Sequence, residues 1–377
     1  MNSVFISFFK NTCVFTLLFL CLFSPNNSPA GEFLYPPLKH EFTEQIGSAS
    51  NEVILRHLTI YGTTDNKAMV GLIKDFQKLY PFAKVRYFEL QSRELFQRVK
   101  REKDTNTQGA DIAISSAMDL QIKLANDGYA RKVDISIPSD IPNWAVWRNE
   151  AFGTTLEPAV IIYNKPYFKN RPLPKNRSDL IAFLETRPPD LYGKLATYNI
   201  AKSGLGYMFF SRDDSQYSGT WDLIRAMSDN GVKLYSQSSK IIDGVSSGDL
   251  KLGYNVLGTY AISQLNDNPN LGVILPEDYT IVFSRLAIIP KAANSHVAGR
   301  LFLEYLLSER GQTQIANKAQ LNPIKASVKS PHPLLRSLHD EKSSLRPIKV
   351  SPGLLVYLDQ QKRKKILKRW RKTLQLP

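Results

Sequence analysis

The stretch HLTIYGTTDNKAMVGLIKDFQKLYP, residues 57–81, decides the fold class of this chain. Its first five residues alternate polar and apolar side chains, which predicts a strand, and residues 62–65 predict a turn. The apolar residues that follow recur at helical spacing: Ala68, Leu72, Phe76 and Leu79. Pro81 ends that helix because proline has no backbone N–H to donate. A strand, a turn and an amphipathic helix in this order predict one βα unit of an open α/β sheet.

The same pattern occurs twice more in the next 45 residues. A strand at 84–90 precedes a charged helix around 94–101, and a strand at 110–114 precedes a helix at 118–126. Three βα units in succession predict a mostly parallel sheet with helices on both faces. Ligands of such sheets bind at the carboxyl ends of the strands.

Beyond residue 150 the chain predicts a second α/β lobe. Residues 152–165 form a long extended stretch interrupted by Pro158, which suits a strand that crosses between lobes. Strands at 193–197 and 232–235 flank a helix at 220–230. Later apolar strands at 271–275 and 280–289 and a helix with Val297, Leu301 and Tyr305 on one face predict a return to the first lobe. The predicted divisions are lobe one at 53–157 plus about 275–345, lobe two at 158–274, and a tail at 346–377.

The N-terminus predicts secretion. Lys10 precedes a short apolar run at 14–23, and Ser28-Pro29-Ala30 places small residues where signal peptidase cuts. We therefore expect residues 1–30 to be a signal peptide cleaved near Ala30, with residues 31–52 as a leader and the mature chain in the periplasm; an uncleaved membrane anchor is the alternative. Both cysteines, Cys13 and Cys21, fall inside the signal, which excludes thiol catalysis, cysteine-ligated zinc and disulfides in the mature chain.

Net charge favours anionic partners. The 377 residues contain 49 Lys and Arg against 34 Asp and Glu, a formal charge of +15. Eight of the cations lie after Asp359, with no acid following: Lys362, Arg363, Lys364, Lys365, Lys368, Arg369, Arg371 and Lys372. On a helix, Ile366, Trp370 and Leu374 share one stripe, so the tail either docks Trp370 on the body or presents a basic surface to a membrane or an acidic partner.

The sequence contains no motif of a known catalytic, phosphate-binding or nucleic-acid-binding site, so we expect neither an enzyme nor a nucleic-acid partner. What recurs is a strand that ends in small polar residues at a helix start. These residues are Thr63, Thr64, Asp65, Ser115, Ser116, Ser203, Gly204, Ser238 and Ser239. Unsatisfied backbone N–H groups at helix N-termini, with neighbouring hydroxyls, suit a carboxylate or a phosphate. The alternative at each position is an ordinary helix cap.

Three further residues are candidates for the same cleft. Glu157, like Asp65, could accept ligand hydroxyls or pair with a cation within the protein. Arg285 is the best placed cation for an anionic ligand, with a hinge salt bridge as the alternative. Tyr163 could stack on a ligand or fill the hinge core.

Four segments resemble the periplasmic solute-binding proteins of ABC importers, in the branch that holds ferric-iron, sugar-phosphate and phosphonate binders. The segments are ADIAISSAMDLQ (110–121), NDGYA (126–130), EPAVIIYNK (157–165) and GYNVLGTYA (253–261). The resemblance spans roughly residues 58–370. It implies the type II periplasmic binding protein fold, in which two α/β lobes joined by crossing hinge strands close over a solute. It also implies that the solute passes to a permease in the inner membrane.

The chain departs from the ferric-binding pattern at one place. The resemblance implies a pair of adjacent tyrosines as iron ligands, but here the corresponding stretch, residues 255–260, holds only Tyr260. Asn255 and Thr259 instead offer an amide and a hydroxyl, which suit an organic anion such as a sugar phosphate or a phosphonate. We therefore expect a monomeric binder of a small organic anion, without metal or cofactor. The alternatives are ferric iron held by Tyr260, Glu157 and Asp65, and a sensor subunit that reports the solute to a signalling system.

Overall fold

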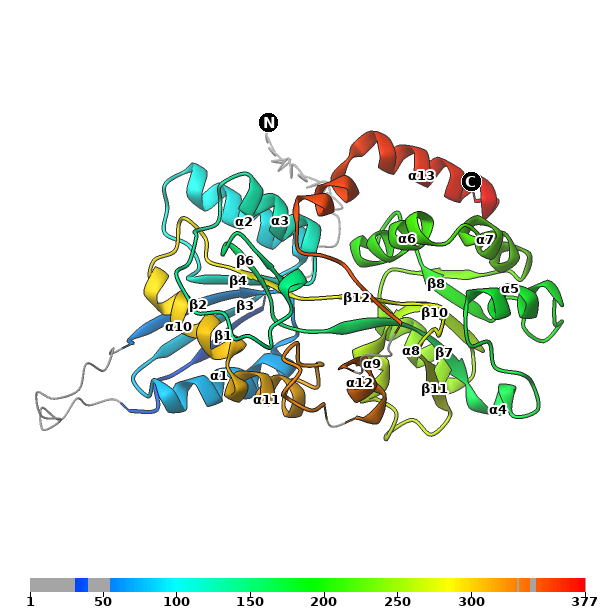
Figure 1. The fold of residues 1–377 in the computed structure, drawn as a ribbon, viewed down its shortest axis with the longest axis horizontal. Helices are drawn as coiled ribbons and strands as arrows, with labels where there is room; N and C mark the ends of the chain where they lie inside the picture. Colours follow the sequence, from blue (N-terminus) through cyan, green and yellow to red (C-terminus); the bar gives the residue numbers. More distant parts are fainter. Residues whose placement is uncertain (1–30, 40–54, 331, 340–343, 377) are drawn as a thin grey trace, which may run out of the picture.

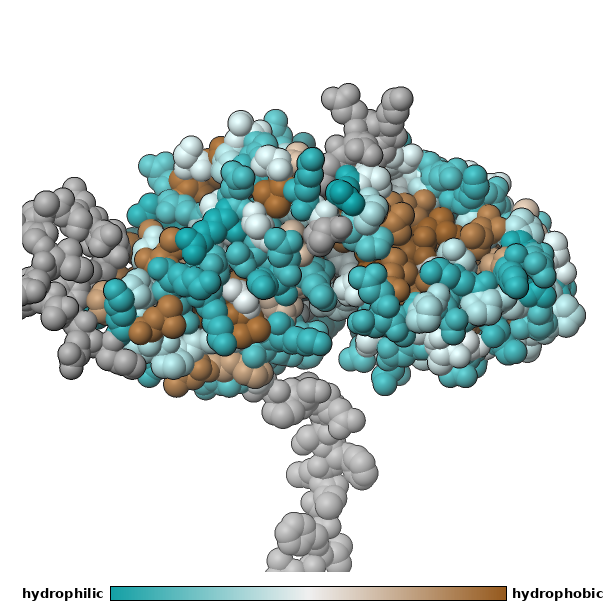
Figure 2. Space-filling view, turned by 90° about the horizontal axis from the view of Figure 1, so that it is seen from below, coloured by the Kyte–Doolittle hydropathy of each residue, from teal (hydrophilic) through white to brown (hydrophobic). Residues whose placement is uncertain are grey.

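The computed structural model describes residues 31–39, 55–330, 332–339 and 344–376. The predicted signal peptide and residues 40–52 of the predicted leader lie outside the described residues. The described chain forms two lobes side by side, each built on a seven-stranded sheet with helices on its faces (Figure 1). Seen from below, hydrophobic side chains gather on the second lobe (Figure 2). None of the helices in these ranges is long and apolar enough to span a membrane.

The sheet of lobe one has the order β1-β3-β2-β4-β13-β6-β5. Its strands are β1 (Gly31–Tyr35), β2 (His57–Gly62), β3 (Lys84–Glu89), β4 (Ile112–Ser115), β5 (Val146–Trp147), β6 (Ala151–Gly153) and β13 (Leu286–Ile288). Its helices are α1 (Asn66–Leu79), α2 (Ser92–Asp104), α3 (Met118–Asn126), α10 (His296–Leu307) and α11 (Glu309–Asn317), with a short 3-10 turn η1 (Asn143–Ala145) before β5. Helices α1, α10 and α11 share one apolar core, and α2 and α3 belong to another. The three predicted βα units are therefore confirmed as β2-α1, β3-α2 and β4-α3.

The sheet of lobe two has the order β14-β12-β7-β10-β8-β9, with β11 also paired to β7. Its strands are β7 (Glu157–Asn164), β8 (Leu195–Tyr198), β9 (Lys233–Tyr235), β10 (Leu252–Leu257), β11 (Leu271–Ile274), β12 (Thr280–Phe283) and β14 (Leu345–Pro347). Its helices are α4 (Lys165–Phe168), α5 (Arg177–Glu185), α6 (Gly204–Gln216), α7 (Thr220–Asp229), α8 (Ser238–Ser247), α9 (Gly258–Ser263), α12 (Pro333–Arg336) and the short η2 (Ser337–His339).

Two short connections join strands of the two sheets, and a third passage follows α11, because Ile324 packs in lobe one whereas Leu335 packs in lobe two. The predicted continuation of lobe one to about residue 345 is therefore wrong. β6 belongs to the first sheet and β7 to the second, so residues 153–157 make one crossing, as the extended stretch around Pro158 predicted. The second crossing differs from the prediction. The run at 280–289 is split, because β12 pairs with β7 in lobe two whereas β13 pairs with β4 and β6 in lobe one.

Two other features correct the sequence-based expectations. Gly31–Tyr35, assigned to a leader, forms strand β1, which pairs antiparallel with β3 along its whole length. The sheets are mixed rather than mostly parallel. β2 is parallel to β3 and β4, and β8 is parallel to β9 and β10, but the strands that enter or leave at the crossings add antiparallel pairs.

The C-terminal tail packs across the top of the molecule (Figure 1). After β14, the 3-10 segment η3 (Pro352–Leu358) packs on α3 of lobe one and on α6 of lobe two, and α13 (Gln360–Thr373) lies against α7. Asp359 caps α13 by accepting the backbone N–H groups of Gln361 and Lys362. Trp370 is only 2% exposed and meets Phe210 of α6 edge-on, with ring centroids 4.9 Å apart. The structure thus favours the docked tail over a free basic helix.

Candidate functional site

The strand ends bring most of the predicted polar residues to the region between the lobes. In lobe one, β2 ends at Gly62 and β4 at Ser115, where α1 and α3 begin soon after. In lobe two, β8 and β10 end at Tyr198 and Leu257, ahead of α6 and α9. Because parallel strands present their carboxyl ends at one edge of a sheet, each lobe gathers its helix N-termini there.

Arg285 lies at the centre of this region, immediately after β12. Its guanidinium forms a buried ion pair with Glu157, with Nε 2.9 Å from Oε1 and Nη2 3.3 Å from Oε2. Glu157 is fully buried and Arg285 is 3% exposed. Burial lowers the pKa of Arg285, but the charges of Glu157 and Tyr260 and the hydrogen bonds to both together outweigh it, so the net shift is upward and the guanidinium stays charged. Of the two roles considered for Arg285, the structure shows the hinge salt bridge.

The same guanidinium also joins the two lobes. Nη1 donates to Thr64 Oγ1 of lobe one at 3.1 Å, and Nη2 donates to the hydroxyl of Tyr260 in lobe two at 3.4 Å. A guanidinium carries five N–H groups. These two bonds and the two bonds to Glu157 use four of them, which leaves one N–H of Nη1 outside this set. Arg285 is therefore both a structural tie and a donor at the point where the lobes meet.

Glu157 is saturated with donors from the protein. Besides Arg285, it accepts from the Thr155 hydroxyl at 2.8 Å and from the Thr259 hydroxyl at 2.9 Å. Thr155 was not among the predicted residues, although a hydroxyl two positions before Glu157 on an extended segment was a usable signal. Thr259 was predicted as a ligand contact, and the structure places it, fully buried, on Glu157.

Tyr260 stands at the start of α9 between the apolar cores of both lobes. Arg285 lowers the pKa of Tyr260, but burial and the negative charges of Glu157 and Asp65 together raise it above its ordinary value. The phenol is thus neutral at neutral pH. Asp65, which is exposed at the end of the β2–α1 turn, thus lies near enough to Tyr260 for its charge to act on the phenol.

The lobe-one wall of the cleft is formed by two hydroxyl-bearing turns. The backbone N–H of Ser116 donates to Thr63 Oγ1 at 3.1 Å, and the two hydroxyl oxygens are 3.5 Å apart. Ser115 is buried and accepts from the Ala117 N–H at 3.1 Å. At the N-terminus of α1 the backbone N–H of Asn66 donates to Glu89 Oε2 at 2.8 Å, whereas the N-cap residue of α3 makes no side-chain cap bond. This wall therefore offers hydroxyl and amide donors beside the carboxylate of Asp65.

The lobe-two wall centres on Tyr198, which sequence reasoning missed. Its hydroxyl bonds to the Ser238 hydroxyl at the start of α8, and burial raises the pKa of Tyr198 to about 12. Ser203 caps α6 by accepting the Gly206 N–H at 3.0 Å, and Gly204 and Ser239 are exposed. The position of Tyr198, directly at the end of a predicted strand, was the signal that could have identified it.

Two predicted residues lie apart from this cluster. Tyr163 is near the far end of β7, where its ring meets Phe168 edge-on at 5.6 Å. Asn255 sits in a bulge of β10 with φ of 56°, and its amide donates to Asp213 Oδ2 at 2.6 Å. Asn255 therefore serves the interior of lobe two, since a left-handed residue in a bulge turns its side chain away from the regular strand direction.

Comparison with known proteins identifies the family to which this chain is similar. Residues 108–341 match the model of the bacterial extracellular solute-binding proteins. No curated protein matches the chain in sequence. The crystal structure of the substrate-binding protein of an ABC transporter from Agrobacterium tumefaciens is 38% identical, with a TM-score of 0.79, and the match covers 93% of this chain and all of that one.

Two more distant structures share the fold. AfuA from Actinobacillus pleuropneumoniae, with fructose-6-phosphate bound, is 18% identical over 85% of this chain and 99% of its own, with a TM-score of 0.66. Apo ferric ion-binding protein A from Pasteurella haemolytica is also 18% identical, over 83% of this chain and 98% of its own, with a TM-score of 0.66. The family expected from the sequence motifs is confirmed, and the chain belongs to the bacterial extracellular solute-binding proteins.

Proposed function

We propose that this chain is the extracytoplasmic solute-binding component of an ABC importer, and that it binds a small organic anion between its lobes for delivery to an inner-membrane permease. The 38% identical substrate-binding protein of an ABC transporter supports the transport role. The signal-like residues 1–30 support export to the periplasm. The protein acts as a monomer and makes no covalent bond to its solute.

The observation that carries the anion assignment is the donor set around Arg285. The guanidinium is charged and holds Thr64 and Tyr260 from opposite lobes, and one of its N–H groups is unused by these bonds. The N-termini of α3 and α8, which have no side-chain cap bond, add backbone N–H groups with partial positive charge. Asp65 supplies an exposed acceptor for hydroxyls. A solute with both an anionic group and hydroxyls, such as a sugar phosphate, matches donors and acceptor together.

Removing hydroxyls from the lobe-one wall tests this placement. We expect the double variant Thr64→Ala, Ser116→Ala to bind the solute about tenfold or more weakly, because each hydrogen bond to a charged ligand contributes roughly 1.5–3 kcal/mol. The solute is first found by the thermal shift of the ligand-stripped protein with hexose phosphates, phosphoglycerate, aminoethylphosphonate, phosphate and ferric citrate. Affinity is then measured by titration calorimetry.

The matched control is Thr105→Ala, Ser247→Ala, which removes two exposed hydroxyls away from the cleft. This control should bind like the parent protein. A cleft variant that binds the solute as tightly as the parent would place the binding site elsewhere.

Ferric iron is the second candidate, because Tyr260 places one phenol in the cleft near Asp65. Both oxygens of Glu157 are already occupied by Thr155, Thr259 and Arg285. Iron would therefore depend mainly on Tyr260 and Asp65, fewer protein ligands than the three residues first considered.

The raised pKa of Tyr260 gives the iron alternative a defined pH dependence. Iron binds the phenolate, so it must displace a proton that is held more tightly than in free tyrosine. Through Tyr260, ferric affinity should rise about tenfold per pH unit below that pKa, and the visible charge-transfer band should disappear in Tyr260→Phe. Titration of ferric citrate at several pH values measures this. A band that is independent of pH and survives the substitution would show that other residues hold the iron.

A further inference from the structure

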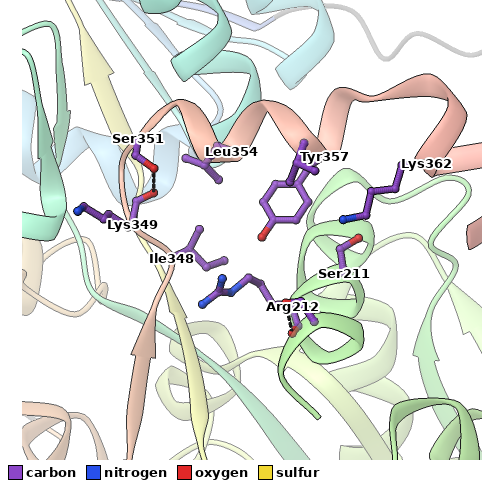
Figure 3. Close-up of a pocket in the computed structure, with 11 residues that line it drawn as sticks. Ser211, Arg212, Ile348, Lys349, Ser351, Leu354, Tyr357 and Lys362 are labelled. Atoms are coloured by element: carbon purple, nitrogen blue, oxygen red, sulfur yellow. Dashed lines mark hydrogen bonds between the residues drawn. The ribbon is translucent and has the colours of Figure 1, made fainter. Parts of the chain in front are cut away.

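A cavity of about 260 Å³ lies outside the interlobe cleft, between α6 and the tail that runs from Ile348 to Lys362 (Figure 3). α6 begins at the cleft with Ser203 as its cap. Ser211 lies roughly two turns further along, about 12 Å at 1.5 Å per residue. None of the residues that line this cavity belongs to the cluster around Arg285.

The cavity carries positive charge without a compensating carboxylate. Arg212 of α6 and Lys349 and Lys362 of the tail contribute to its lining, and no Asp or Glu does. Within the described ranges, none of these three cations forms an ion pair. The charge of Asp119 in α3 contributes to raising the pKa of Tyr357, but Asp119 does not line the cavity. Lys349 is exposed and its side chain extends away from the other two cations (Figure 3), so Arg212 and Lys362 are the cations that border the space. Because like charges repel at close range, these two cations favour an anion between them.

A buried hydroxyl without a hydrogen-bond partner gives independent support. Ser211 is 4% exposed, and among the described residues neither its Oγ nor the buried Nε of Arg212 has a partner in good hydrogen-bond geometry. The neighbouring hydroxyls are those of Tyr207 beside Ser211 and of Tyr357 beside Arg212. The Ser211 hydroxyl faces the space beside Tyr357 and the amino group of Lys362 (Figure 3). Buried polar atoms are almost always bonded, so unpartnered donors at a cationic cavity indicate a missing acceptor.

We propose that this cavity is a second anion-binding site, which takes a small phosphate monoester or inorganic phosphate. Phosphate supplies several acceptor oxygens for the Arg212 guanidinium, the Lys362 ammonium group and the Ser211 hydroxyl. The volume of the cavity limits the size of the ligand, since about 260 Å³ is below the roughly 300–1,000 Å³ of pockets that bind larger ligands. Leu354 and Val356 form an apolar part of the lining, which accommodates a short carbon chain on the phosphate.

The Ser211→Ala variant separates a binding role from a structural one. The hydroxyl has no hydrogen bond of good geometry in the ligand-free protein, with Tyr207 as its neighbour, so its removal should change the thermal midpoint little. Binding of inorganic phosphate and of glycerol 3-phosphate, measured by titration calorimetry on the full mature chain, should weaken several-fold. A variant that binds both as tightly as the parent protein would overturn the assignment.

A charge variant with a matched control tests the cations. Arg212→Gln, Lys362→Gln should weaken binding at least tenfold, whereas Lys364→Gln, Lys365→Gln removes equal charge from exposed positions outside the cavity and should change it less than twofold. Equal losses in both variants would mean non-specific attraction to the basic tail and would overturn the proposal.

Hydrogen exchange locates the bound probe on the chain. Phosphate should slow exchange in residues 205–216 and 348–362, and should do so equally in the cleft variant Thr64→Ala, Ser116→Ala. Protection confined to residues 63–66 and 116–118, and lost in that variant, would assign phosphate to the cleft. That result would refute the second site and leave the proposed function intact.

Discussion

Glu157→Leu is expected to destabilise the protein by about 3–5 kcal/mol, because it leaves the charge of Arg285 buried without a counter-ion. Arg285 is 3% exposed, and its remaining protein partners are the hydroxyls of Thr64 and Tyr260. The same change deprives Thr155 and Thr259 of their acceptor. Calorimetric unfolding should show a clear fall in the thermal midpoint.

Two variants control for this prediction. Glu304→Gln removes one partner of the pair Arg300–Glu304, in which both side chains are 38% exposed, and should cost less than about 1 kcal/mol. The double variant Glu157→Leu, Arg285→Leu removes the unpaired charge and should recover much of the stability. An effect of Glu157→Leu as small as that of Glu304→Gln would contradict the assignment of a charged hinge pair.

Trp370→Ala is expected to cost about 3–5 kcal/mol, as for other large buried aromatic side chains. Trp370 fastens α13 to lobe two through its edge contact with Phe210. Without the Trp370 side chain, α13 should detach from lobe two, and trypsin should then cleave the chain at the Lys and Arg residues of this helix. The rate of trypsin cleavage after residue 360 and the thermal midpoint both measure this effect.

The conservative variant Trp370→Phe sharpens the test. The indole Nε1 has no hydrogen-bond partner among the described residues, so phenylalanine loses volume but no hydrogen bond. It should retain most of the stability and of the protection from trypsin, and exposed Lys368→Ala should change neither. Equal cleavage of Trp370→Ala and the parent protein would show that other contacts hold the tail.

Local patterns sufficed for the βα units, because the apolar spacing of a strand and of the helix after it lies within about 25 residues. They could not assign strands to sheets. The run at 280–289 is apolar except for Thr280 and for Ser284 and Arg285 at its middle. Its first half pairs with Glu157 and Pro158 and its second half with residues of β4, and this pairing divides it between the two sheets. Strand β1 was missed for the same reason, since Gly31–Tyr35 depends on β3.

In the candidate site, too, local features could be predicted and contacts between distant residues could not. Hydroxyls at strand ends could be predicted because they are local features. The partner of Arg285 could not, because Glu157 is 128 residues away in the sequence. Asn255 looked like a ligand contact in a regular strand, and the bulge that turns it toward Asp213 arises from the register of β10 against β7.

The position of β13 has a consequence for the order in which the lobes can form during synthesis. β13 lies in the middle of the first sheet, between β4 and β6, yet the whole of 157–283 is made before it. Lobe two in turn gains its edge strand β14 and the docked helix α13 only at the C-terminus. Lobe one therefore cannot complete its sheet until the segment 157–283 has been made, and lobe two lacks an edge strand until residues 345–347 follow. Contacts between such distant segments form slowly, so each lobe finishes folding late relative to the synthesis of its first strands.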